Sequence, residues 1–455
     1  MINPIFKERM KLLLGDEYAK FEYELENGDA VKGVRINKIK AKALTGADFD
    51  AFSLEGLSYA EDGYIIEDAD GIGHTPEHHA GLFYMQDPGA MASVCAIDVK
   101  EGWRVLDLCA APGGKSGQAA ARIGDGGFLI SNEYVPKRAK ITVANLERLG
   151  IKNAFVTSLD TAEFKKYYKS YFDLVIADAP CSGEGMFRKS EEARAEWSEE
   201  NVRECAARQS EILTNAAPLV RGGGYLLYST CTYSYEENEA VVQAFLSSHP
   251  DYSLIDVRDE LKAVTADGID LEGDLTTNLY KTRRFYPHIA RGEGQYIALM
   301  RRDTSVGVGE ILYKDASSAP SNAELKIVEQ FFKENLVKMP SAQVRKANEN
   351  LVLISHGVPL LPRSVFSAGV LIGEIRGRLL FPSHQLFSAY GELFKRRIEL
   401  DSQEVLKYLR GEEIDAPSDT DNGWCVISYR GASLGGGKIS GGKIKNHYPK
   451  GLRNN

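Results

Sequence analysis

Trp103-Arg-Val-Leu-Asp-Leu-Cys-Ala-Ala-Pro-Gly-Gly-Lys115 is the stretch that decides the fold. Residues 104–108 are expected to form a buried strand, and Gly113 and Gly114 allow a turn in which the backbone approaches a ligand closely. A second expected strand, residues 127–132, leads into Glu133, which follows Gly113 by 20 positions. Nucleotide-binding folds place a carboxylate for ribose hydroxyls at about 20 residues from this turn. The stretch therefore predicts a site for a cofactor that carries adenosine.

The composition is that of a globular protein with several domains. The chain has 455 residues, of which 43% are hydrophobic and 26% charged, and this length predicts roughly two to four domains. No apolar run approaches the roughly 20 residues that cross a bilayer, and the N-terminus lacks the features of a signal peptide. The six cysteines include no Cys-x-x-Cys pair, which argues against a zinc site or a disulfide framework. We expect a cytoplasmic, monomeric protein with reduced thiols, no metal and no membrane partner.

Strand-like and helix-like segments alternate from residue 101 to about residue 301. This alternation predicts an α/β, doubly wound parallel sheet, in which ligands bind beyond the carboxyl ends of the strands. The expected strands are residues 104–108, 127–132, 154–157, 172–177, 224–229 and 295–300. The expected helices are residues 115–123, 136–149, 192–219 and 235–248.

The regions on either side of this domain are expected to be smaller mixed α+β domains. Residues 1–100 would form an N-terminal α+β domain of an RNA-binding type, in which Phe83 and Tyr84 either stack on a base or, more commonly for such a pair, pack between domains. The doubly wound sheet would occupy residues 101–303. A linker (304–321), an accessory domain (322–385) and a final domain (386–455) would follow. The net charge is −9, but the segment from Leu434 to Asn455 contains five Lys and Arg residues and no acid.

Two glycine-rich stretches resemble phosphate-binding loops without satisfying the motif. Gly114-Lys115-Ser116 lacks the earlier glycine that a P-loop requires, because Cys109 stands there. Gly437 to Lys443 has better spacing, but Ile444 replaces the Ser or Thr that binds Mg²⁺. Neither stretch supports an ATPase.

A cysteine follows each of two buried strands, in Asp178-Ala-Pro-Cys181 and in Ser229-Thr-Cys231. If these strands are neighbours, a spacing of about 4.8 Å brings both thiols to one mouth of the sheet. Most single buried cysteines are inert, but two beside a carboxylate and a nucleotide-type turn indicate chemistry. A thiolate that adds to carbon 6 of cytosine activates carbon 5 toward an electrophilic methyl group, while a carboxylate near nitrogen 3 stabilises the developing charge.

Four motifs together resemble the Nop/Sun family of RNA cytosine-C5 methyltransferases. They are Asp107 to Lys115, Asn132 to Gly150, Asp178 to Gly185, and Ser229 to Ser234. The resemblance extends over about residues 3–301 and implies a Rossmann-like, class I methyltransferase fold. The basic segment Ile444 to Arg453 is similar to the PUA-like RNA-binding end of the RsmF type, which favours ribosomal RNA, 16S in particular.

The resemblance implies roles for individual residues. Glu133 would bind the ribose of S-adenosyl-L-methionine, Asp160 the adenine side, and Asp178 would lie between cofactor and base. Arg138 matches a position near the cofactor, although a helix-surface ion pair is an equal alternative. Cys231 would be the nucleophile and Cys181 the cysteine that assists release, an assignment that rests on the resemblance alone. The turn residues expected to contact the cofactor are Cys109, Ala110, Ala111, Pro112, Gly113, Gly114 and Lys115.

Three other functions remain open from the sequence. The first is the same reaction on tRNA, and the second is a non-catalytic RNA-binding or ribosome-assembly factor. The third, methylation of an exocyclic amine, usually uses Asp-Pro-Pro-Tyr, which Ala179 and Cys181 interrupt here. The residues expected to contact RNA phosphates are Arg188, Lys189, Lys443, Lys445, Lys450 and Arg453.

Overall fold

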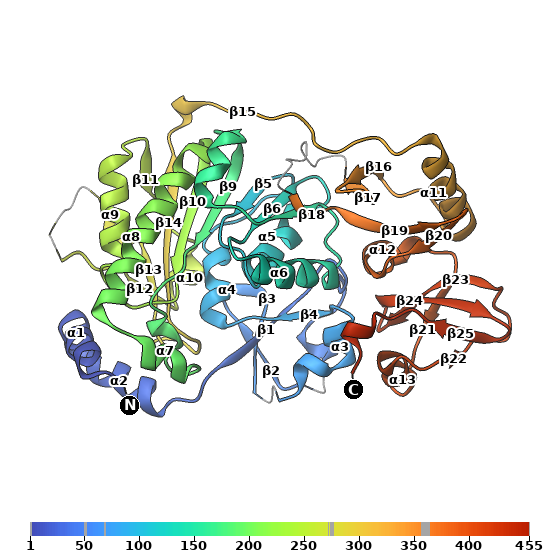
Figure 1. Cartoon of the computed structure of the whole chain (residues 1–455). Helices are drawn as coiled ribbons and strands as arrows, with labels where there is room; N and C mark the ends of the chain where they lie inside the picture. Colours follow the sequence, from blue (N-terminus) through green and yellow to red (C-terminus); the bar gives the residue numbers. More distant parts are fainter. Residues whose placement is uncertain are drawn as a thin grey trace.

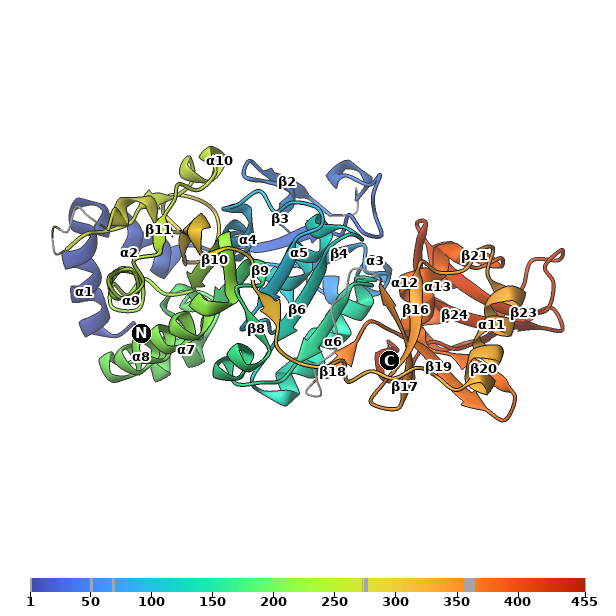
Figure 2. The same cartoon turned by 90° about the horizontal axis from the view of Figure 1, so that it is seen from above.

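The molecule is elongated, with N-terminal helices at one end, a large central α/β sheet, and C-terminal sheets at the other end (Figure 1, Figure 2). The computed structural model describes residues 2–49, 52–67, 70–271, 273, 277–355 and 365–454. Among the helices it describes, none is long and apolar enough to cross a membrane.

The central sheet contains every strand predicted between residues 101 and 301. Its strands are β5 (Arg104–Asp107), β6 (Phe128–Asn132), β7 (Ala154–Thr157), β9 (Phe172–Asp178), β10 (Val220–Thr230), β12 (Ala266–Asp267), β13 (Arg283–Phe285), β14 (Gln295–Arg302) and β18 (Val365–Ala368), with β11 (Tyr252–Leu254) paired to β14. The order is β12-β13-β14-β10-β9-β5-β6-β7-β18. The five strands from β10 to β7 are parallel, and β14 is antiparallel to β10. The chain order reverses between β5 and β9, where such sheets bind ligands.

Helices cover both faces of this sheet, as a doubly wound fold requires. On one face α4 (Pro88–Cys95), α5 (Gly114–Ile123) and α6 (Pro136–Arg148) bury side chains such as Ala119 and Leu146 against the strands. On the other face α8 (Glu199–Ala216) and α9 (Glu239–Ser248) bury Leu213 and Val242. Ligands in such folds bind beyond the carboxyl ends of the strands, so the loops that follow β5, β6, β7, β9 and β10 are the place to look for a site.

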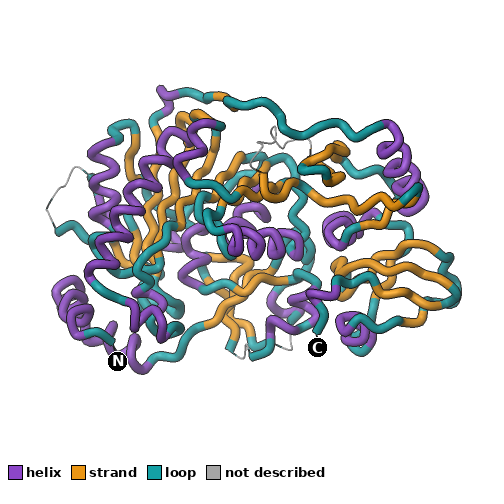
Figure 3. The backbone as a smooth tube through the Cα atoms, viewed as in Figure 1, coloured by secondary structure: helices purple, strands orange, loops and turns teal. Residues whose placement is uncertain are grey.

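The prediction of a single helix over residues 192–219 is wrong. The structure has two helices there, because the first one, α7 (Glu191–Glu196), ends before Trp197 (Figure 3). Trp197 leaves the helix, is buried, and donates from Nε1 to Glu184 Oε1 at 2.8 Å. Ser198 then starts α8 by accepting a hydrogen bond from the Asn201 amide at 3.1 Å. A serine cap within a helical periodicity is a weak signal, since the apolar pattern continues on both sides of it. The last predicted helix begins four residues late, at Glu239, because Tyr235 to Asn238 form a loop.

The N-terminal region divides between two places. Its antiparallel sheet has the order β2-β3-β1-β4, from β1 (Lys32–Ile36), β2 (Leu54–Leu57), β3 (Ala60–Ile66) and β4 (Phe83–Met85), with α3 (Pro76–His79) beside it. Helices α1 (Pro4–Leu14) and α2 (Tyr18–Asn27) instead pack Phe6 and Phe21 against Phe187 and Tyr233, which lie in the loops after β9 and β10. Phe83 and Tyr84 are buried core residues and do not present rings for a base.

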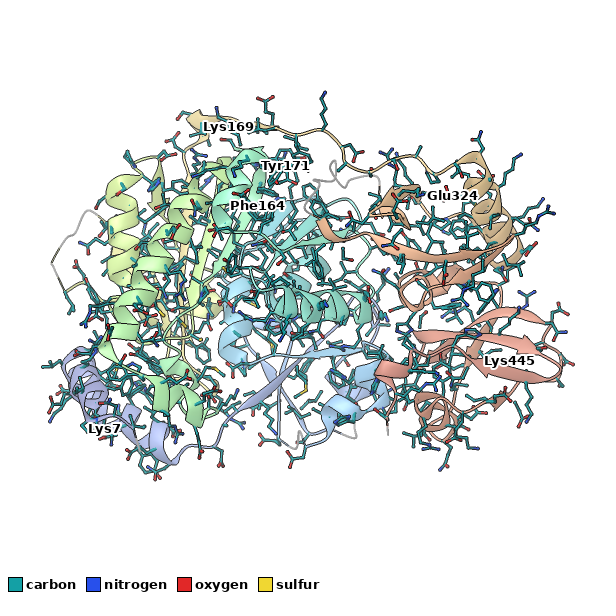
Figure 4. All side chains as sticks on the ribbon, viewed as in Figure 1. Lys7, Phe164, Lys169, Tyr171, Glu324 and Lys445 are labelled. Carbon is teal, nitrogen blue, oxygen red and sulfur yellow. The ribbon has the colours of Figure 1, made fainter. Side chains whose placement is uncertain are left out.

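The C-terminal region is joined to the central domain at several points. The expected linker 304–321 contains β15 (Glu310–Ile311), which pairs with β8 (Tyr168–Lys169) near the labelled Lys169 in Figure 4. After α11 (Asn322–Asn335), a four-stranded sheet has the order β16-β17-β19-β20, while β18 extends the central sheet beside β7. The strands of the four-stranded sheet are β16 (Ala342–Ala347), β17 (Asn350–Ser355), β19 (Val370–Arg376) and β20 (Leu379–Pro382).

The final sheet follows α12 (His384–Tyr390) and has the order β21-β23-β24-β25-β22. Its strands are β21 (Arg397–Glu399), β22 (Ile414–Asp415), β23 (Gly423–Tyr429), β24 (Ala432–Ser440) and β25 (Lys443–Asn446), and α13 (Glu404–Arg410) covers one side. Ile427 and Tyr408 of this part share a core with Val34 and Ile36 of the N-terminal sheet. Gly435, Gly436 and Gly437 lie within β24 and not in a loop. A Cβ on Gly436 would lie 2.1 Å from the Phe387 ring.

Candidate active site

The glycine turn follows β5 and leads directly into α5. Gly113 has φ +108°, a conformation that favours glycine, and Gly114 is the first residue of the helix. A Cβ on Gly114 would lie 3.1 Å from the Tyr84 ring, so the backbone of the turn packs tightly against β4. The amide of Ala110 donates to Asn132 O at 2.7 Å, which ties the turn to the end of β6.

Two carboxylates follow the next two strands. Glu133, just after β6, is buried; its Oε1 accepts from the Val135 amide at 2.9 Å, and its Oε2 lies 3.4 Å from Arg138 Nη1. Arg138 also donates to Ala111 O at 3.2 Å, so it joins the turn to the carboxylate. Asp160, after β7, is exposed and accepts from the Ala162 amide at 2.9 Å. The predicted cofactor residues therefore line one edge of the sheet.

Two further residues of this edge were missed by the sequence analysis. Asp107, the last residue of β5, is fully buried; one oxygen accepts from Ser116 Oγ at 2.7 Å, and Oδ1 has no partner within the described structure. Burial raises the pKa of this carboxyl to about 7. The Asn132 amide group donates to Leu108 O and Leu159 O, so it fixes the loops after three strands. Each is the polar last residue of a short strand, and that position at the strand end was the signal in the sequence.

The two cysteines predicted to converge are in contact. Cys181 follows β9, Cys231 follows β10, and their Sγ atoms lie 3.2 Å apart. Asp178 Oδ1 accepts from Ser229 Oγ at 2.7 Å, and Oδ2 lies 2.7 Å from Lys115 Nζ. The ion pair connects the cysteine loops to the helix that follows the glycine turn. The pKa of Cys181 is raised well above its ordinary value, first by the hydrogen bond with Cys231 and second by burial.

A buried carboxylate fixes the relation between the two cysteine loops. Glu237 accepts from the Ser182 amide at 2.9 Å, from Ser182 Oγ, from Gln209 Nε2 at 2.9 Å and from Thr232 Oγ1 at 3.3 Å. Ser182 follows Cys181, and Thr232 follows Cys231. Burial raises the pKa of Glu237.

A second buried acid, Glu184, supports the same loops from the side of α1. Besides Trp197, it accepts from the Tyr233 amide at 3.0 Å. Burial raises its pKa to about 7. The sequence analysis assigned no role to either glutamate, since both occur in polar loops that resemble solvated turns.

Some of the basic residues expected to contact phosphates are paired within the protein, and others are exposed. The Arg188 side chain is buried and paired within the protein: its Nε lies 3.0 Å from Glu293 Oε2, and its guanidinium also donates to Gly292 O. Lys189 lies 2.6 Å from Asp87 Oδ2. Arg453 donates to Tyr448 O at 3.2 Å, and Lys443 pairs with Asp415. Lys445 and Lys450 are exposed. We therefore withdraw Arg188 as a phosphate contact, because its charge is already neutralised in the interior.

The residues at the carboxyl ends of β5, β6 and β7 fit an adenosine-bearing cofactor. Gly113 leaves the turn without a side chain, Asp107 presents a buried oxygen without a partner, and a carboxylate follows each of the two neighbouring strands. The fold and this edge define a Rossmann-like methyltransferase that uses S-adenosylmethionine.

Comparison with known proteins agrees with this class along the whole chain. Residues 94–301 match the family model described as 16S rRNA methyltransferase RsmB/F, residues 2–88 the N-terminal domain of 16S rRNA methyltransferase RsmF, and residues 395–454 the methyltransferase RsmF PUA domain. The chain belongs to the RsmF family of 16S rRNA methyltransferases. Its relatives include ribosomal RNA small subunit methyltransferase F of Erwinia tasmaniensis, 32% identical over 99% of this chain and 96% of that protein, and that of Vibrio vulnificus, 31% identical over 92% and 91%.

Solved structures support the same fold. A methyltransferase homolog protein from Pyrococcus horikoshii is 25% identical with a TM-score of 0.57, covering 66% of this chain and 95% of that one. NSun6 from the same organism, solved with SFG, is 20% identical with a TM-score of 0.55, covering 66% and 98%. These similarities confirm the Nop/Sun methyltransferase fold predicted from the motifs.

Proposed function

We propose that this protein methylates carbon 5 of a cytosine in 16S rRNA through a covalent bond between Cys231 and carbon 6 of the base. The observation that carries the proposal is the 3.2 Å contact between the two thiols at the ends of adjacent strands, beside the Asp178–Lys115 pair. S-adenosylmethionine supplies the electrophilic methyl group when it is bound at the edge formed by the glycine turn, Glu133 and Asp160. A methyltransferase that acts on an amine has no need of paired thiols.

The two cysteines are proposed to have different roles. Their sulfur atoms lie 3.2 Å apart and either thiol can donate to the other, so the contact is compatible with either order. The assignment of Cys231 as the nucleophile follows the family resemblance, and the form that attacks carbon 6 is its thiolate.

Asp178 and Lys115 prepare the base for attack. Asp178 is held on one oxygen by Ser229 and on the other by Lys115, so the carboxylate is fixed in direction. We propose that it lies near nitrogen 3 and accepts a hydrogen bond from a proton carried there. Nitrogen 3 gains electron density as the Cys231 sulfur–carbon 6 bond forms, and that proton neutralises it.

Release requires loss of the carbon-5 proton and cleavage of the sulfur–carbon 6 bond. Cys181 acts as the base in its thiolate form, after it has released its own proton to solvent. The thiolate takes the carbon-5 proton, the electrons of that carbon–hydrogen bond form the carbon 5–carbon 6 double bond, and the electrons of the sulfur–carbon 6 bond leave with Cys231 as a thiolate. Cys181 is then protonated again and Cys231 is again a thiolate, so the site is regenerated.

The rest of the chain is proposed to hold the RNA. The N-terminal region (1–100) and the PUA-like end (386–455) would supply binding, the residues between 322 and 385 an accessory domain, and the protein would act as a monomer. A cytosine that is paired in the mature ribosomal subunit would have to be flipped out or reached before assembly. Light scattering of the purified protein, with and without RNA, tests the monomer.

Bisulfite sequencing of rRNA and tRNA from a deletion strain tests the proposed reaction. Complementation with the natural chain should restore protection of at least one cytosine in 16S rRNA from deamination by bisulfite, whereas complementation with Cys231→Ala should not. Mass spectrometry of nucleosides distinguishes 5-methylcytosine from a methylated amine. Protection that returns with Cys231→Ala would overturn the covalent mechanism, and protection confined to tRNA would overturn the substrate.

A further inference from the structure

A row of one aromatic and two basic residues crosses the final sheet. Trp424 on β23 lies opposite Lys438 on β24, and Lys438 lies opposite Lys445 on β25. Facing residues of neighbouring strands project from the same side of a sheet. The Lys438 Nζ atom lies 5.4 Å from the centre of the Trp424 ring, and the His447 ring is 4.7 Å from that ring. Figure 4 labels Lys445 on this sheet.

An open pocket adjoins this row, between the sheet, α11 and the hairpin that leads into β20. Phe381 meets the Trp424 ring edge to face, with ring centres 6.1 Å apart. Arg378 and Leu379 are exposed at the rim. The lining residues that matter for binding are Gln330, Glu334, Arg378, Phe381, Trp424 and Lys438. The pocket therefore has aromatic side chains, Phe381 and Trp424, beside basic ones, Arg378 and Lys438.

The charges of this row are not balanced within the described part of the protein. Two lysines directly opposite one another repel, and neither Lys438 nor Lys445 forms an ion pair among the described residues. Lys443, two positions before Lys445 on the same strand, is by contrast paired with Asp415. Glu334, the carboxylate among the described lining residues, accepts from Gln330 Nε2 at 2.9 Å. The facing lysines are thus arranged for an anion that comes from outside the chain.

We propose that the pocket and this row bind one unpaired nucleotide of the RNA, with its base on the rings of Trp424 and Phe381 and its phosphates on Lys438 and Lys445. Lysine over an indole is a flexible cover that can turn toward a phosphate and expose the ring to a base. Single-stranded RNA offers both the aromatic base and the flanking negative charges that this arrangement satisfies. The inference rests on the proposed function because it takes the RNA substrate as the ligand. The site lies in the C-terminal sheet, at the opposite end of the molecule from α1 and far from β9 and β10 in Figure 1, so it serves binding and not chemistry.

Fluorescence anisotropy of the full chain with a short labelled single-stranded RNA, and with the same RNA as a duplex, tests the site. The double variant Lys438→Gln, Lys445→Gln is expected to weaken single-strand binding about tenfold. Its plot of log K against log salt should become shallower by about 1.4, since each phosphate contact to a single strand contributes about 0.7. Phe381→Leu keeps an apolar wall but removes a ring, and is expected to lose about fivefold or more. Lys407→Gln, which removes an exposed lysine of α13 in the same part of the chain, is the matched control and should change binding less than twofold.

The outcomes separate this proposal from the proposed reaction. Binding can be lost in the double variant whether or not methylation occurs, because the anisotropy measurement needs no turnover. Unchanged single-strand affinity would overturn the nucleotide site and leave the face for another partner, such as a protein. An equal loss on duplex and single strand would also overturn it, because a diffuse basic surface predicts that result.

Discussion

Cys181 and Cys231 are 50 positions apart in the sequence, and their sulfur atoms lie 3.2 Å apart. The contact exists because β9 and β10 are adjacent parallel strands whose register pairs Asp178 with Ser229. Each cysteine is carried a few residues past that pair, into loops that Glu237 joins. The reactive pair is therefore a property of the sheet order, and the two loops must stay in register for it to exist.

Replacement of Cys181 by alanine is expected to trap the covalent protein–RNA complex. Without the Cys181 thiol, Cys231 still adds to carbon 6, but the carbon-5 proton has no nearby acceptor, so turnover falls by about 100-fold or more. Denaturing gels of the variant incubated with RNA and S-adenosylmethionine should show a slowly migrating adduct. The double variant with Cys231→Ala should show none. An adduct that persists in Cys231→Ala and is absent from Cys181→Ala would reverse the two roles.

Much of the site was accessible from the sequence because its parts stand at strand ends. The glycine turn, Glu133 and the two cysteines follow mostly apolar segments of five or six residues in a recognisable alternation, and the parallel sheet then brings them to one edge. The partners that hold them are not accessible in this way. Glu293 neutralises Arg188 from 105 positions away, and nothing local to Arg188 distinguishes it from a solvated loop charge. Glu184 and Glu237 likewise look like surface acids until the loops around them are folded.

Asp178→Asn is expected to impair the chemistry more than cofactor binding. Asparagine can still accept from Ser229 and contact Lys115, but it lacks the negative charge proposed to hold a proton at nitrogen 3. We expect kcat to fall by about 100-fold while the calorimetric Kd for S-adenosylmethionine changes less than about tenfold. Lys115→Met removes the cation 2.7 Å from Asp178 and is expected to weaken cofactor binding as well. A large loss of cofactor affinity with unchanged kcat in Asp178→Asn would assign that residue to the cofactor alone.

Glu237→Gln tests whether the register of the cysteine loops matters for catalysis. The amide has one acceptor oxygen in place of two, so the four donors that meet at Glu237 can no longer all be satisfied, and Ser182 and Thr232 move apart. Glu237 is a positioning residue. Its replacement should lower kcat by about tenfold and reduce adduct formation by Cys231, and the Kd of the cofactor should not change. The adjacent Glu236→Gln is the matched control, since Glu236 bonds Arg9 and Ser234 instead. Equal effects from both variants would indicate general destabilisation of the loop.

Glu184 should make the protein less stable as the pH rises from about 4.5 to about 7. Its pKa is near 4.5 in the unfolded chain and about 7 in the folded protein, so over this window the native state retains a proton that the unfolded state has released. Stability is therefore lost with rising pH, by roughly 3 kcal/mol once both forms are ionised. Glu184→Gln cannot titrate, and the difference in unfolding free energy between pH 5 and pH 8, measured with urea, should shrink by about that amount. Glu196→Gln, an exposed neighbour on α7, should leave the difference unchanged. An unaltered pH dependence in Glu184→Gln would mean that the carboxyl is ionised in the native protein, with Arg9 and the Thr232 hydroxyl compensating for its burial.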